Sequence, residues 1–509
     1  MKTLPDLVKN AAEKFGGKPY IREKNGDGIS EKTFAEFYDD AKKIAAFLKS
    51  VFGRKIHSAT IGATSYNYLA AHLGAMIGGN VGVPIDALLS PADVAELLVR
   101  ADVEALFYDA RFEPAVPALK KLCPKIKTFV SLSDEIGENL TVGKILSEYS
   151  PEEPDAPAAS DLAAILFTSG TTGKAKGVML THANFMDNVF CCDNESSPED
   201  VLLTVLPIHH VYCFTCDILL SLRYGATVCV NDSLMKVAQN LKLFQPTIIL
   251  IVPMIAATIY KQIKNAAKAR PEIPIQMIAQ SVFGGRLTTI YSGGAYLNPE
   301  LLAAYKELGI TIAQGYGMTE CSPRITSADL SRPSNGDVGK IVKGCEVKIV
   351  DGEITVKSGS VMRGYYKDDA STAETLKDGW LYTGDLGYID EFDRLYITGR
   401  KKNLIILSNG ENVSPEELEN KLESIAVAQE FMVYSEDEIL TAELFLGSEL
   451  YAGKSREETL AEVRGKIKEL NKTLPTSKNI RRIRVRNVEF EKTTSRKIKR
   501  SQTEKGEVI

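Results

Sequence analysis

The segment from residue 164 to residue 177 reads AILFTSGTTGKAKG. Its first four residues form a short apolar run, which is typical of a buried parallel strand. The glycines that follow permit tight turns that present backbone N–H groups to phosphate oxygens, and the hydroxyls and two lysines add donors and positive charge. Since the spacing of a Walker A loop is absent, the segment predicts a different phosphate-binding loop. A flexible surface loop rich in glycine, serine and threonine is the alternative.

Similar short apolar runs recur through the first four hundred residues, with helical patterns between them. They lie at Thr247 to Val252, Thr288 to Tyr291 and Thr311 to Ala313. The pair Ser90-Pro91 is typical of a helix start, because serine caps the first turn and proline suits the first helical position. This alternation of strand and helix predicts an α/β architecture with buried parallel strands.

The pattern of the sequence changes near residue 400. A polar loop at residues 408–412 precedes the sequence SPEE at 414–417, which predicts a capping box that opens a helix. A hairpin is expected next, with strands near residues 431–434 and 440–446. A helix that begins with Ser455 and Glu458 as a capping box follows. One face of this helix carries Leu460, Val463, Ile467 and Leu470.

These patterns predict two domains of unequal size. The chain has 509 residues, which is more than one hydrophobic core normally serves. We therefore expect a large α/β domain of several subdomains at residues 1–400 and a small, mobile α+β domain at residues 401–509.

Charge and hydropathy exclude several classes of partner. The formal net charge is −5, so the molecule as a whole offers no argument for nucleic acid or an anionic membrane. Residues 1–14 lack the apolar stretch of a secretory signal. The most apolar run, residues 248–257, is too short to cross a bilayer and is interrupted by Pro253. We expect a cytoplasmic protein with no transmembrane segment and no nucleic-acid partner.

The eight cysteines are expected to be free thiols that pack as small apolar side chains. One cluster permits another interpretation. His209 and His210 precede Cys213 and Cys216, and a Cys-x-x-Cys pair beside histidine can bind zinc. The apolar residues around the pair and the lack of a second ligand pair at a suitable spacing favour buried thiols.

Four further segments, together with the glycine-rich loop, give the chain a resemblance to the adenylate-forming superfamily, and most of all to its long-chain fatty acyl-CoA synthetases. The segments are YSGGA at 291–295, QGYGMTE at 314–320, YTGD at 382–385 with Gly399-Arg400, and KTTSRKI at 492–498. The resemblance extends over nearly the whole chain. Because five motifs occur in the family's order, it displaces the interpretation of the first loop as a flexible surface segment.

The resemblance implies an acid–thiol ligase that makes an acyl-adenylate from a carboxylic acid and ATP and then transfers the acyl group to coenzyme A. Its cofactors would be ATP, Mg²⁺ and coenzyme A. The implied nucleotide-binding residues are Thr168, Ser169, Gly170, Thr171, Thr172, Gly173, Lys174, Gly294, Ala295, Gln314, Gly315, Tyr316, Gly317, Thr319, Asp385 and Arg400. Within this set, Tyr316 would lie against the adenine, the threonines would bind phosphates, and Asp385 would accept both ribose hydroxyls.

Three catalytic residues and a hinge are also implied by the resemblance. Glu320 would hold Mg²⁺, a hard cation that prefers carboxylate oxygens. Lys497 would bridge the substrate carboxylate and the α-phosphate and stabilise the charge that develops there. His210 would gate the acid pocket, with a hydrogen-bonded core histidine as the alternative. Lys402 stands at the family's hinge, about which the small domain would rotate so that residues 408–411 face the incoming thiol.

The chain departs from the family's pattern at three positions. Glu491 stands where proline is usual, and Arg496, beside the predicted catalytic lysine, stands where glycine is usual. Ala175 replaces a common proline in the phosphate loop. We expect the backbone of the lysine loop to differ from the family's norm and activity to survive these departures.

The acid itself is expected to be a fatty acid. Residues 207–212 read PIHHVY, and amino-acid-activating relatives carry an aspartate near Tyr212 to pair with the substrate ammonium. Burying an unpaired ammonium is costly, so apolar neighbours at this point disfavour an α-amino acid. An aryl acid is the alternative substrate. An acyl carrier protein in trans is the alternative acceptor, because the basic residues from Lys478 to Arg500 suit an acidic carrier as well as coenzyme A.

Overall fold

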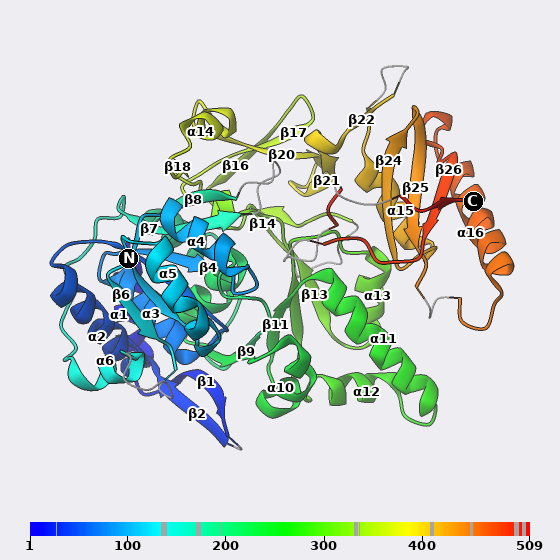
Figure 1. Cartoon of the computed structure of the whole chain (residues 1–509). Coiled ribbons are helices and arrows are strands. Elements are labelled where there is room, and N and C mark those ends of the chain that lie inside the picture. The colour runs from blue at the N-terminus through cyan, green and yellow to red at the C-terminus, as the bar shows by residue number, and fades with distance from the viewer. Residues whose placement is uncertain are drawn as a thin grey trace.

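The computed structural model describes the whole chain except residues 27, 134–139, 169–174, 194, 330–333, 335, 408–411, 448–450, 493–497 and 501–504. Figure 1 shows a large body that contains both N-terminal sheets and a smaller unit at the C-terminal end, drawn in orange and red. This mixed α/β arrangement confirms the predicted fold class.

The first sheet of the large body has seven strands and supplies one wall of the candidate site. Its order is β13 (Thr311–Gln314), β12 (Thr289–Ser292), β11 (Ile248–Ile251), β9 (Val201–Thr204), β10 (Thr227–Val230), β1 (Pro19–Asn25) and β2 (Gly28–Thr33). All neighbours are parallel except β1 and β2. The strands predicted near residues 247, 288 and 311 are thus confirmed as β11, β12 and β13, and they are adjacent in space.

The second sheet also has seven strands. Its order is β18 (Gly364–Tyr365), β8 (Lys176–Thr181), β7 (Leu162–Thr168), β4 (Val81–Ile85), β3 (His57–Ile61), β5 (Val103–Tyr108) and β6 (Thr128–Ser131). The strand predicted before the glycine-rich loop is β7. It runs parallel to β4 and antiparallel to β8, which follows it directly in the chain. The glycine-rich segment therefore connects two paired strands.

Helices cover both sheets, and one hydrophobic core joins the sheets. Side chains of the first sheet (Leu202, Val228) and of the second (Ala164, Leu166) belong to the same buried cluster. The helices of this body are α1 (Leu4–Phe15), α2 (Phe34–Phe52), α3 (Tyr66–Ile77), α4 (Pro91–Arg100), α5 (Val116–Leu122), α6 (Val142–Glu148), α7 (His182–Val189), α8 (Val211–Cys213), α9 (Leu220–Tyr224), α10 (Val237–Phe244), α11 (Pro253–Ala269), α12 (Ile275–Val282) and α13 (Pro299–Glu307). As predicted, Ser90 caps α4 and Pro91 is its first residue.

A third sheet, whose strand pairs are all antiparallel, leads toward the C-terminal unit. It contains β16 (Cys345–Val350), β17 (Glu353–Ser358), β20 (Trp380–Ile389), β19 (Leu376–Lys377) and β21 (Leu395–Arg400), with α14 (Asp369–Thr375) beside it. Two further strand pairs are β14 (Thr326–Ser327) with β15 (Lys340–Ile341), and β22 (Ile405–Ile406) with β23 (Asn412–Val413).

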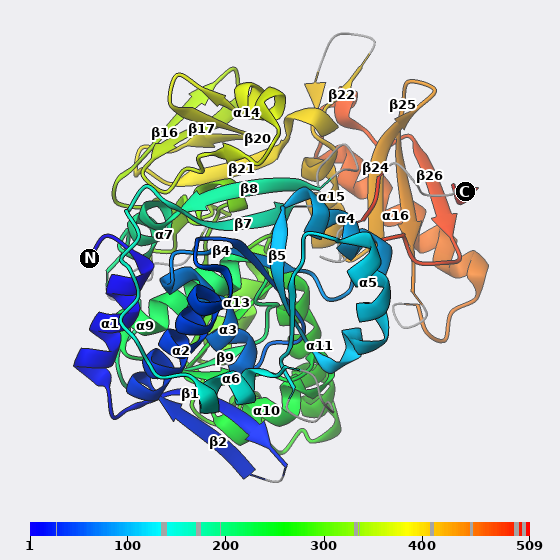
Figure 2. The same cartoon turned by 60° about the vertical axis from the view of Figure 1, so that its left-hand side comes forward.

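The C-terminal unit has its own sheet and its own core. The sheet has the order β24 (Glu430–Glu436), β25 (Ile439–Phe445), β26 (Arg482–Arg486) and β27 (Glu507–Val508), with α15 (Pro415–Ser424) and α16 (Arg456–Lys472) packed beside it. Its apolar cluster contains no residue before Ile405. In the turned view of Figure 2 this unit again lies to one side of the large body. The predicted hairpin is confirmed as β24 and β25.

The two helix starts predicted in this unit differ in their capping. Ser455 and Glu458 form a complete capping box on α16. The Ser414 side chain caps α15 by accepting from the Glu417 N–H, but the Glu417 carboxylate accepts from Lys478 instead of reaching back to the cap. The prediction of a full capping box was therefore wrong at α15, because the Glu417 carboxylate pairs with Lys478, which is 61 residues away in the sequence.

All eight cysteines are free, and six of them are buried, as the sequence predicted. In the part of the chain that the structure describes, no three or more His, Cys, Asp or Glu side chains gather as a metal site. Within the same ranges, no helix combines the length and apolar character that a membrane span requires.

Candidate active site

Two neighbouring parallel strands bring two predicted motifs together. Ser292 at the end of β12 is in register with Gln314 at the end of β13, and the Gly315 N–H donates to the Ser292 carbonyl over 3.1 Å. The loops that follow these strands therefore begin side by side at the carboxyl edge of the sheet, where open α/β sheets bind ligands. Gly294 has φ of 81°, a left-handed conformation that a side chain would strain.

Three of the predicted nucleotide-binding residues, Tyr316, Asp385 and Arg400, form one cluster of hydrogen bonds and ion pairs. The Tyr316 hydroxyl donates to Asp385 Oδ2 over 2.7 Å, and Arg400 Nε lies 2.8 Å from Asp385 Oδ1. Asp385 on β20 pairs directly with Arg400 on β21, so the strands themselves set this contact. Asp385 is buried, and burial together with the neighbouring carboxylate raises the pKa of Tyr316 well above its usual value. The cluster holds a carboxylate in a fixed position.

The loop that carries Tyr316 is tightly packed against the following backbone. A side chain at Gly317 would place its Cβ 1.9 Å from the Pro323 carbonyl oxygen. Met318 N–H donates to that same carbonyl, and Tyr316 N–H donates to Thr326 Oγ1 over 2.9 Å. Glycine at 317 is thus required by close approach of the backbone.

Glu320 lies in the same loop, in the short helix Thr319–Cys321, and is only 8% exposed. Its Oε1 accepts from the Tyr365 hydroxyl over 2.8 Å. Burial raises the pKa of Glu320, while the Tyr365 hydrogen bond and the positive charges of Arg400 and Lys176 oppose that rise. A nearby cation would further favour the charged carboxylate.

The residues present fit Mg²⁺. Protein-bound Mg²⁺ is commonly held by one or two carboxylates together with substrate phosphates, rather than by a cage of protein ligands. Glu320 supplies one buried carboxylate, and the described residues contain no competing cluster of three ligands. Glu320 is therefore suited to share the cation with the phosphates of a nucleotide.

The predicted phosphate loop is bounded by two residues that the structure describes. Thr168 ends β7 and Lys176 begins β8, and the two residues are in register. Lys176 Nζ lies 4.8 Å from the centre of the Tyr365 ring, the same ring whose hydroxyl contacts Glu320. The loop therefore begins and ends near the Glu320 carboxylate. The other predicted residues of the loop, Ser169, Gly170, Thr171, Thr172, Gly173 and Lys174, lie outside the described residues.

Lys497 also lies outside the described residues, as does Arg496. The residues on either side are paired through their backbones. Lys492 and Ile498 form an antiparallel β-bridge, and the Lys499 N–H donates to the Glu491 carbonyl over 2.8 Å. Glu491, which departs from the family's proline, thus contributes its backbone carbonyl to this pairing.

His210 is an exposed residue at the N-terminus of α8. Its ring centre lies 4.3 Å from that of His209, whose Nε2 is 3.8 Å from Asp86 Oδ2. Burial and the neighbouring His210 lower the pKa of His209 to about 3, so His209 is neutral at physiological pH. The alternative of a core histidine thus describes His209 better than His210.

The predicted apolar wall after these histidines is present, and it contains one residue that sequence reasoning missed. Val211, Phe214 and Ile218 are buried. The Tyr212 ring lies against Gly293, so that a Cβ added to this glycine would be 3.4 Å from the ring. Asp217 is fully buried in the same helical stretch, and Cys213 Sγ donates to its Oδ2 over 3.5 Å. The sequence did contain a signal for Asp217, because it is an isolated acidic residue in an apolar run.

Asp217 does not act as a charged partner at neutral pH. Burial raises the pKa of its carboxyl to about 8, so the group holds its proton. Asp217 is thus uncharged while no cation lies beside it, and an ammonium placed there would lower the pKa of its carboxyl.

Lys402 lies in a short 3-10 helix, Lys401–Asn403, directly after β21. The preceding Lys401 is anchored to Glu353 of the third sheet by an ion pair of 2.7 Å. Immediately before, a Cβ at Gly399 would lie 2.0 Å from Ser414 Oγ at the start of α15. The C-terminal unit thus packs closely on the end of β21, beside Arg400.

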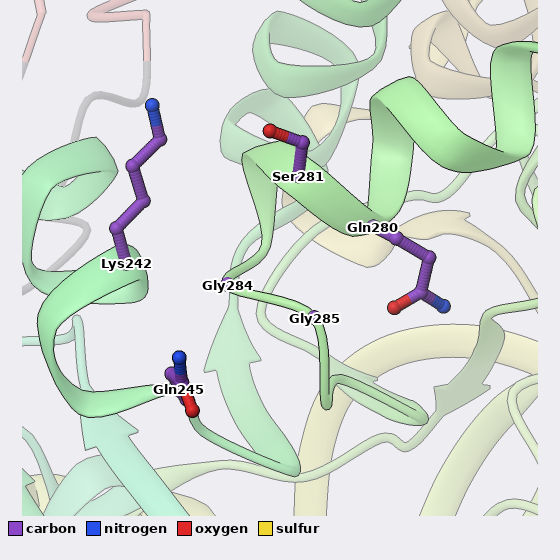
Figure 3. A pocket seen from close by; sticks show the side chains of 6 residues that line it. All are labelled: Lys242, Gln245, Gln280, Ser281, Gly284 and Gly285. Carbon is purple, nitrogen blue, oxygen red and sulfur yellow. The ribbon is translucent and has the colours of Figure 1, made fainter.

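A separate pocket of about 390 Å³ opens between α10 and the end of α12 (Figure 3). It is lined by Lys242, Gln245, Gln280, Ser281, Gly284 and Gly285. None of the predicted site residues lines it. The pocket is therefore distinct from the cluster around Asp385.

Comparison with known proteins agrees with this fold. The sequence profile of the AMP-binding enzyme family matches residues 8–366, and that of the AMP-binding enzyme C-terminal domain matches residues 402–506. The chain belongs to the AMP-binding enzyme family, and within it to the AMP-forming acyl-CoA synthetases and CoA ligases. Enzymes of this class use ATP, Mg²⁺ and coenzyme A, the three cofactors that the sequence predicted.

Three similar proteins illustrate the range of the class. The peroxisomal long chain acyl-CoA synthetase 6 of Arabidopsis thaliana is 31% identical over 67% of this chain and 57% of its own length. The 4-coumarate:CoA ligase 1 of Petunia hybrida is 30% identical over 80% of this chain and 76% of its own. The O-succinylbenzoate coenzyme A synthetase of Bacillus subtilis, solved with AMP, has a TM-score of 0.79 at 25% identity and covers 99% of both chains.

Proposed function

We propose that this chain activates a fatty acid as an acyl-adenylate with ATP and Mg²⁺ and transfers the acyl group to coenzyme A. The observation that carries the proposal is the cluster of Tyr316, Asp385 and Arg400, with the buried Glu320 in the same loop as Tyr316. The Tyr316 ring suits a base, the fixed Asp385 carboxylate suits a ribose, and the Arg400 cation suits a phosphate. The activity and the substrate are proposals, since the aligned stretch spans only 57% of the Arabidopsis relative.

The proposed chemistry is two displacements. A carboxylate oxygen attacks the α-phosphate in line and pyrophosphate leaves; the thiol of coenzyme A then attacks the acyl carbon and AMP leaves, carrying the bridging oxygen. Positioning and charge neutralisation are therefore the main tasks. Mg²⁺, when bound, would neutralise charge on the phosphates.

Each task is assigned to residues of this chain. Glu320 would hold the cation, and Lys497 would bridge the attacking carboxylate and the α-phosphate. Asp385 would accept the ribose hydroxyls on lone pairs that Tyr316 and Arg400 leave, because each carboxylate oxygen can accept more than one hydrogen bond. The phosphates would be bound by Thr168, Thr171, Thr172 and Thr319, and the adenine by Gly294, Ala295, Gln314, Gly315 and Tyr316.

The two steps need two arrangements of the C-terminal unit. We propose that residues 1–400 and 401–509 are the moving parts and that Lys402 is the pivot between them. The separate core of the C-terminal unit supports independent movement. In the second arrangement Lys497 would leave the site and residues 408–411 would face the thiol.

A fatty acid is proposed for the acid because the wall after His210 is apolar and its one acidic residue, Asp217, is neutral at pH 7. His210, exposed at the start of α8, would gate this pocket. The Petunia relative, named as a 4-coumarate:CoA ligase, supports an aryl acid as the second candidate. Transfer to a carrier protein in trans is the second candidate for the acceptor. A cytoplasmic location stays a prediction of the sequence.

The substrate is tested by pyrophosphate release across fatty acids of graded length, benzoates, cinnamates and amino acids. Turnover should rise along the fatty series, since each buried methylene contributes about 0.8 kcal/mol. Lys497→Ala should lose roughly a hundredfold or more with the best acid, which separates adenylation from contaminating phosphatase activity. Preference for an α-amino acid would refute the fatty-acid proposal, and a flat fatty series with active cinnamates would favour the aryl acid.

The acceptor is tested with the best acid from that series. Steady AMP release with free coenzyme A is expected. A single burst of adenylate that only an acyl carrier protein discharges would replace coenzyme A by the carrier.

A further inference from the structure

Tyr365 lies between the Glu320 carboxylate and the Lys176 ammonium. Its hydroxyl donates to Glu320 Oε1 over 2.8 Å, and Lys176 Nζ lies over its ring, 4.8 Å from the centre. The side chain is buried. Tyr365 is therefore in contact with a charge of each sign, although it is 45 residues from Glu320 in the sequence.

The backbone around Tyr365 is fixed on both sides. Strand β18 pairs antiparallel with β8, with Tyr365 opposite Val178, two residues beyond Lys176. Three residues before Tyr365, the Met362 N–H donates to the Glu320 carbonyl over 2.8 Å. The Tyr365 N–H donates to Thr372 Oγ1 over 2.9 Å. The ring is thus held by its own strand, and its contacts with Glu320 and Lys176 follow from that placement.

This placement suits a residue that orients others. A carboxylate that ligates a metal is usually held by hydrogen bonds from residues behind it, which set its rotamer. A lysine ammonium over an aromatic face is attracted to the ring and is restricted in its motion. One tyrosine can therefore set the metal carboxylate and the cation at the end of the phosphate loop relative to each other.

We propose that Tyr365 is a positioning residue for nucleotide binding: its hydroxyl orients Glu320 toward Mg²⁺, and its ring holds the Lys176 ammonium beside the phosphates. The inference rests on the proposed function, because it takes ATP and Mg²⁺ as the ligands. The two contacts are separable. Tyr365→Phe removes the hydroxyl and keeps the ring, whereas Tyr365→Leu removes both.

The adjacent tyrosine provides a matched control. Tyr366 also donates its hydroxyl to a carboxylate, Asp102 Oδ2, over 2.7 Å. Asp102 is additionally paired with Lys125 and Lys367 and is not a predicted site residue. Tyr366→Phe therefore deletes an equivalent hydrogen bond in the same segment without touching Glu320.

The test measures binding rather than turnover. Mn²⁺, a paramagnetic substitute for Mg²⁺, is titrated by electron paramagnetic resonance into each protein saturated with an ATP analogue that cannot be cleaved between the α- and β-phosphates. Affinity for the analogue alone is measured without metal. Tyr365→Phe should weaken Mn²⁺ binding roughly tenfold or more, the usual effect of removing such a partner, and leave metal-free affinity unchanged. Tyr365→Leu should weaken both, and Tyr366→Phe neither.

Each result decides the matter. Unchanged Mn²⁺ affinity in Tyr365→Phe overturns the inference while leaving the proposed function intact. Equal losses in Tyr365→Phe and Tyr366→Phe overturn it too, since they indicate general damage to the segment. A wild-type protein that binds no analogue refutes the proposed function, and the inference with it.

Discussion

At the scale of single residues, the candidate site is a set of charges held by neighbours. Asp385 is fixed by Tyr316 on one oxygen and by Arg400 on the other, and Glu320 is held by Tyr365. Because these carboxylates are already oriented by their neighbours, no free energy of substrate binding is needed to orient them. The hydroxyl of Tyr316 is thus engaged with Asp385, the proposed ribose residue, and its ring is the part proposed to lie against the base.

Tyr316→Phe keeps the ring and removes the hydrogen bond to Asp385. Hydrogen bonds to charged groups contribute about 1.5–3 kcal/mol, so we expect the KM for ATP to rise about tenfold or more while the KM for the acid stays unchanged. Tyr305→Phe is the control, because Tyr305 donates its hydroxyl to the Ala256 carbonyl in a different core. An equal rise in both variants would mean that the effect is loss of stability.

Asp217 predicts a pH dependence of stability. Its pKa is raised from 3.8 to about 8 by burial, so the folded protein retains a proton that the unfolded chain releases. The resulting stability is full below pH 4 and is lost as the pH rises toward 8, by up to about 1.4 kcal/mol per pH unit. Asp217→Asn, which cannot titrate, should therefore gain in Tm relative to the wild type as the pH rises from 5 to 8. A Tm difference that does not vary with pH would show that Asp217 does not titrate as argued.

At the scale of elements, local sequence patterns predicted the strands well, whereas contacts between distant residues could not be predicted. The strands β7, β11, β12 and β13 were found within about a residue or two because apolar runs and their boundaries are local signals. The order of the strands, which places β12 beside β13, is a property of the sheet and has no such signal.

The same distinction applies to the site. The motif around Glu320 could be found from the sequence, but Tyr365 could not, because nothing in the spacing of residues 320 and 365 indicates that β18 and the Glu320 loop meet. At α15 the sequence predicted a full capping box, and a distant lysine takes the glutamate. Asp217 was missed although it is visible as an isolated charge in an apolar run.

The loop after β13 yields a prediction about its glycine. A Cβ at Gly317 would overlap the Pro323 carbonyl oxygen, so Gly317→Ala must displace the backbone that carries Tyr316 and Glu320. We expect adenylate formation to fall at least tenfold, as misplacement of about an ångström commonly does. Single-turnover formation of the adenylate measures it.

The matched control for this loop is Gly465→Ala in α16, where an added Cβ meets nothing within 4 Å. That change should leave activity intact and stabilise the helix by about 0.5–1 kcal/mol. A Gly317→Ala enzyme as active as Gly465→Ala would show that the loop tolerates the shift.

At the scale of the whole molecule, two units with separate cores meet at the end of β21. Just before Lys402 the chain is held at two points, because Gly399 packs closely against Ser414 and Lys401 forms an ion pair with Glu353. A chain that must swing about this point needs backbone freedom there. The proposed rotation therefore requires freedom of the backbone at Lys402, a residue with no proposed contact to substrate.

Lys402→Pro fixes φ at that position and should hinder the rotation. We expect adenylate formation within about twofold of the wild type and transfer from supplied acyl-adenylate to coenzyme A reduced at least tenfold, on the logic that hinge changes act on the step that needs movement. Lys402→Ala, which loses the side chain but keeps backbone freedom, should retain both steps. Equal loss of both steps in Lys402→Pro would indicate general damage.

The central claim is that a carboxylate oxygen attacks the α-phosphate of ATP. The most direct measurement uses the best acid labelled with oxygen-18 in its carboxyl group, together with ATP, Mg²⁺ and coenzyme A, and analyses the products by mass spectrometry. The account predicts AMP that carries one oxygen-18 atom, unlabelled pyrophosphate and an acyl-CoA thioester. Unlabelled AMP, or ADP with labelled phosphate, would contradict it.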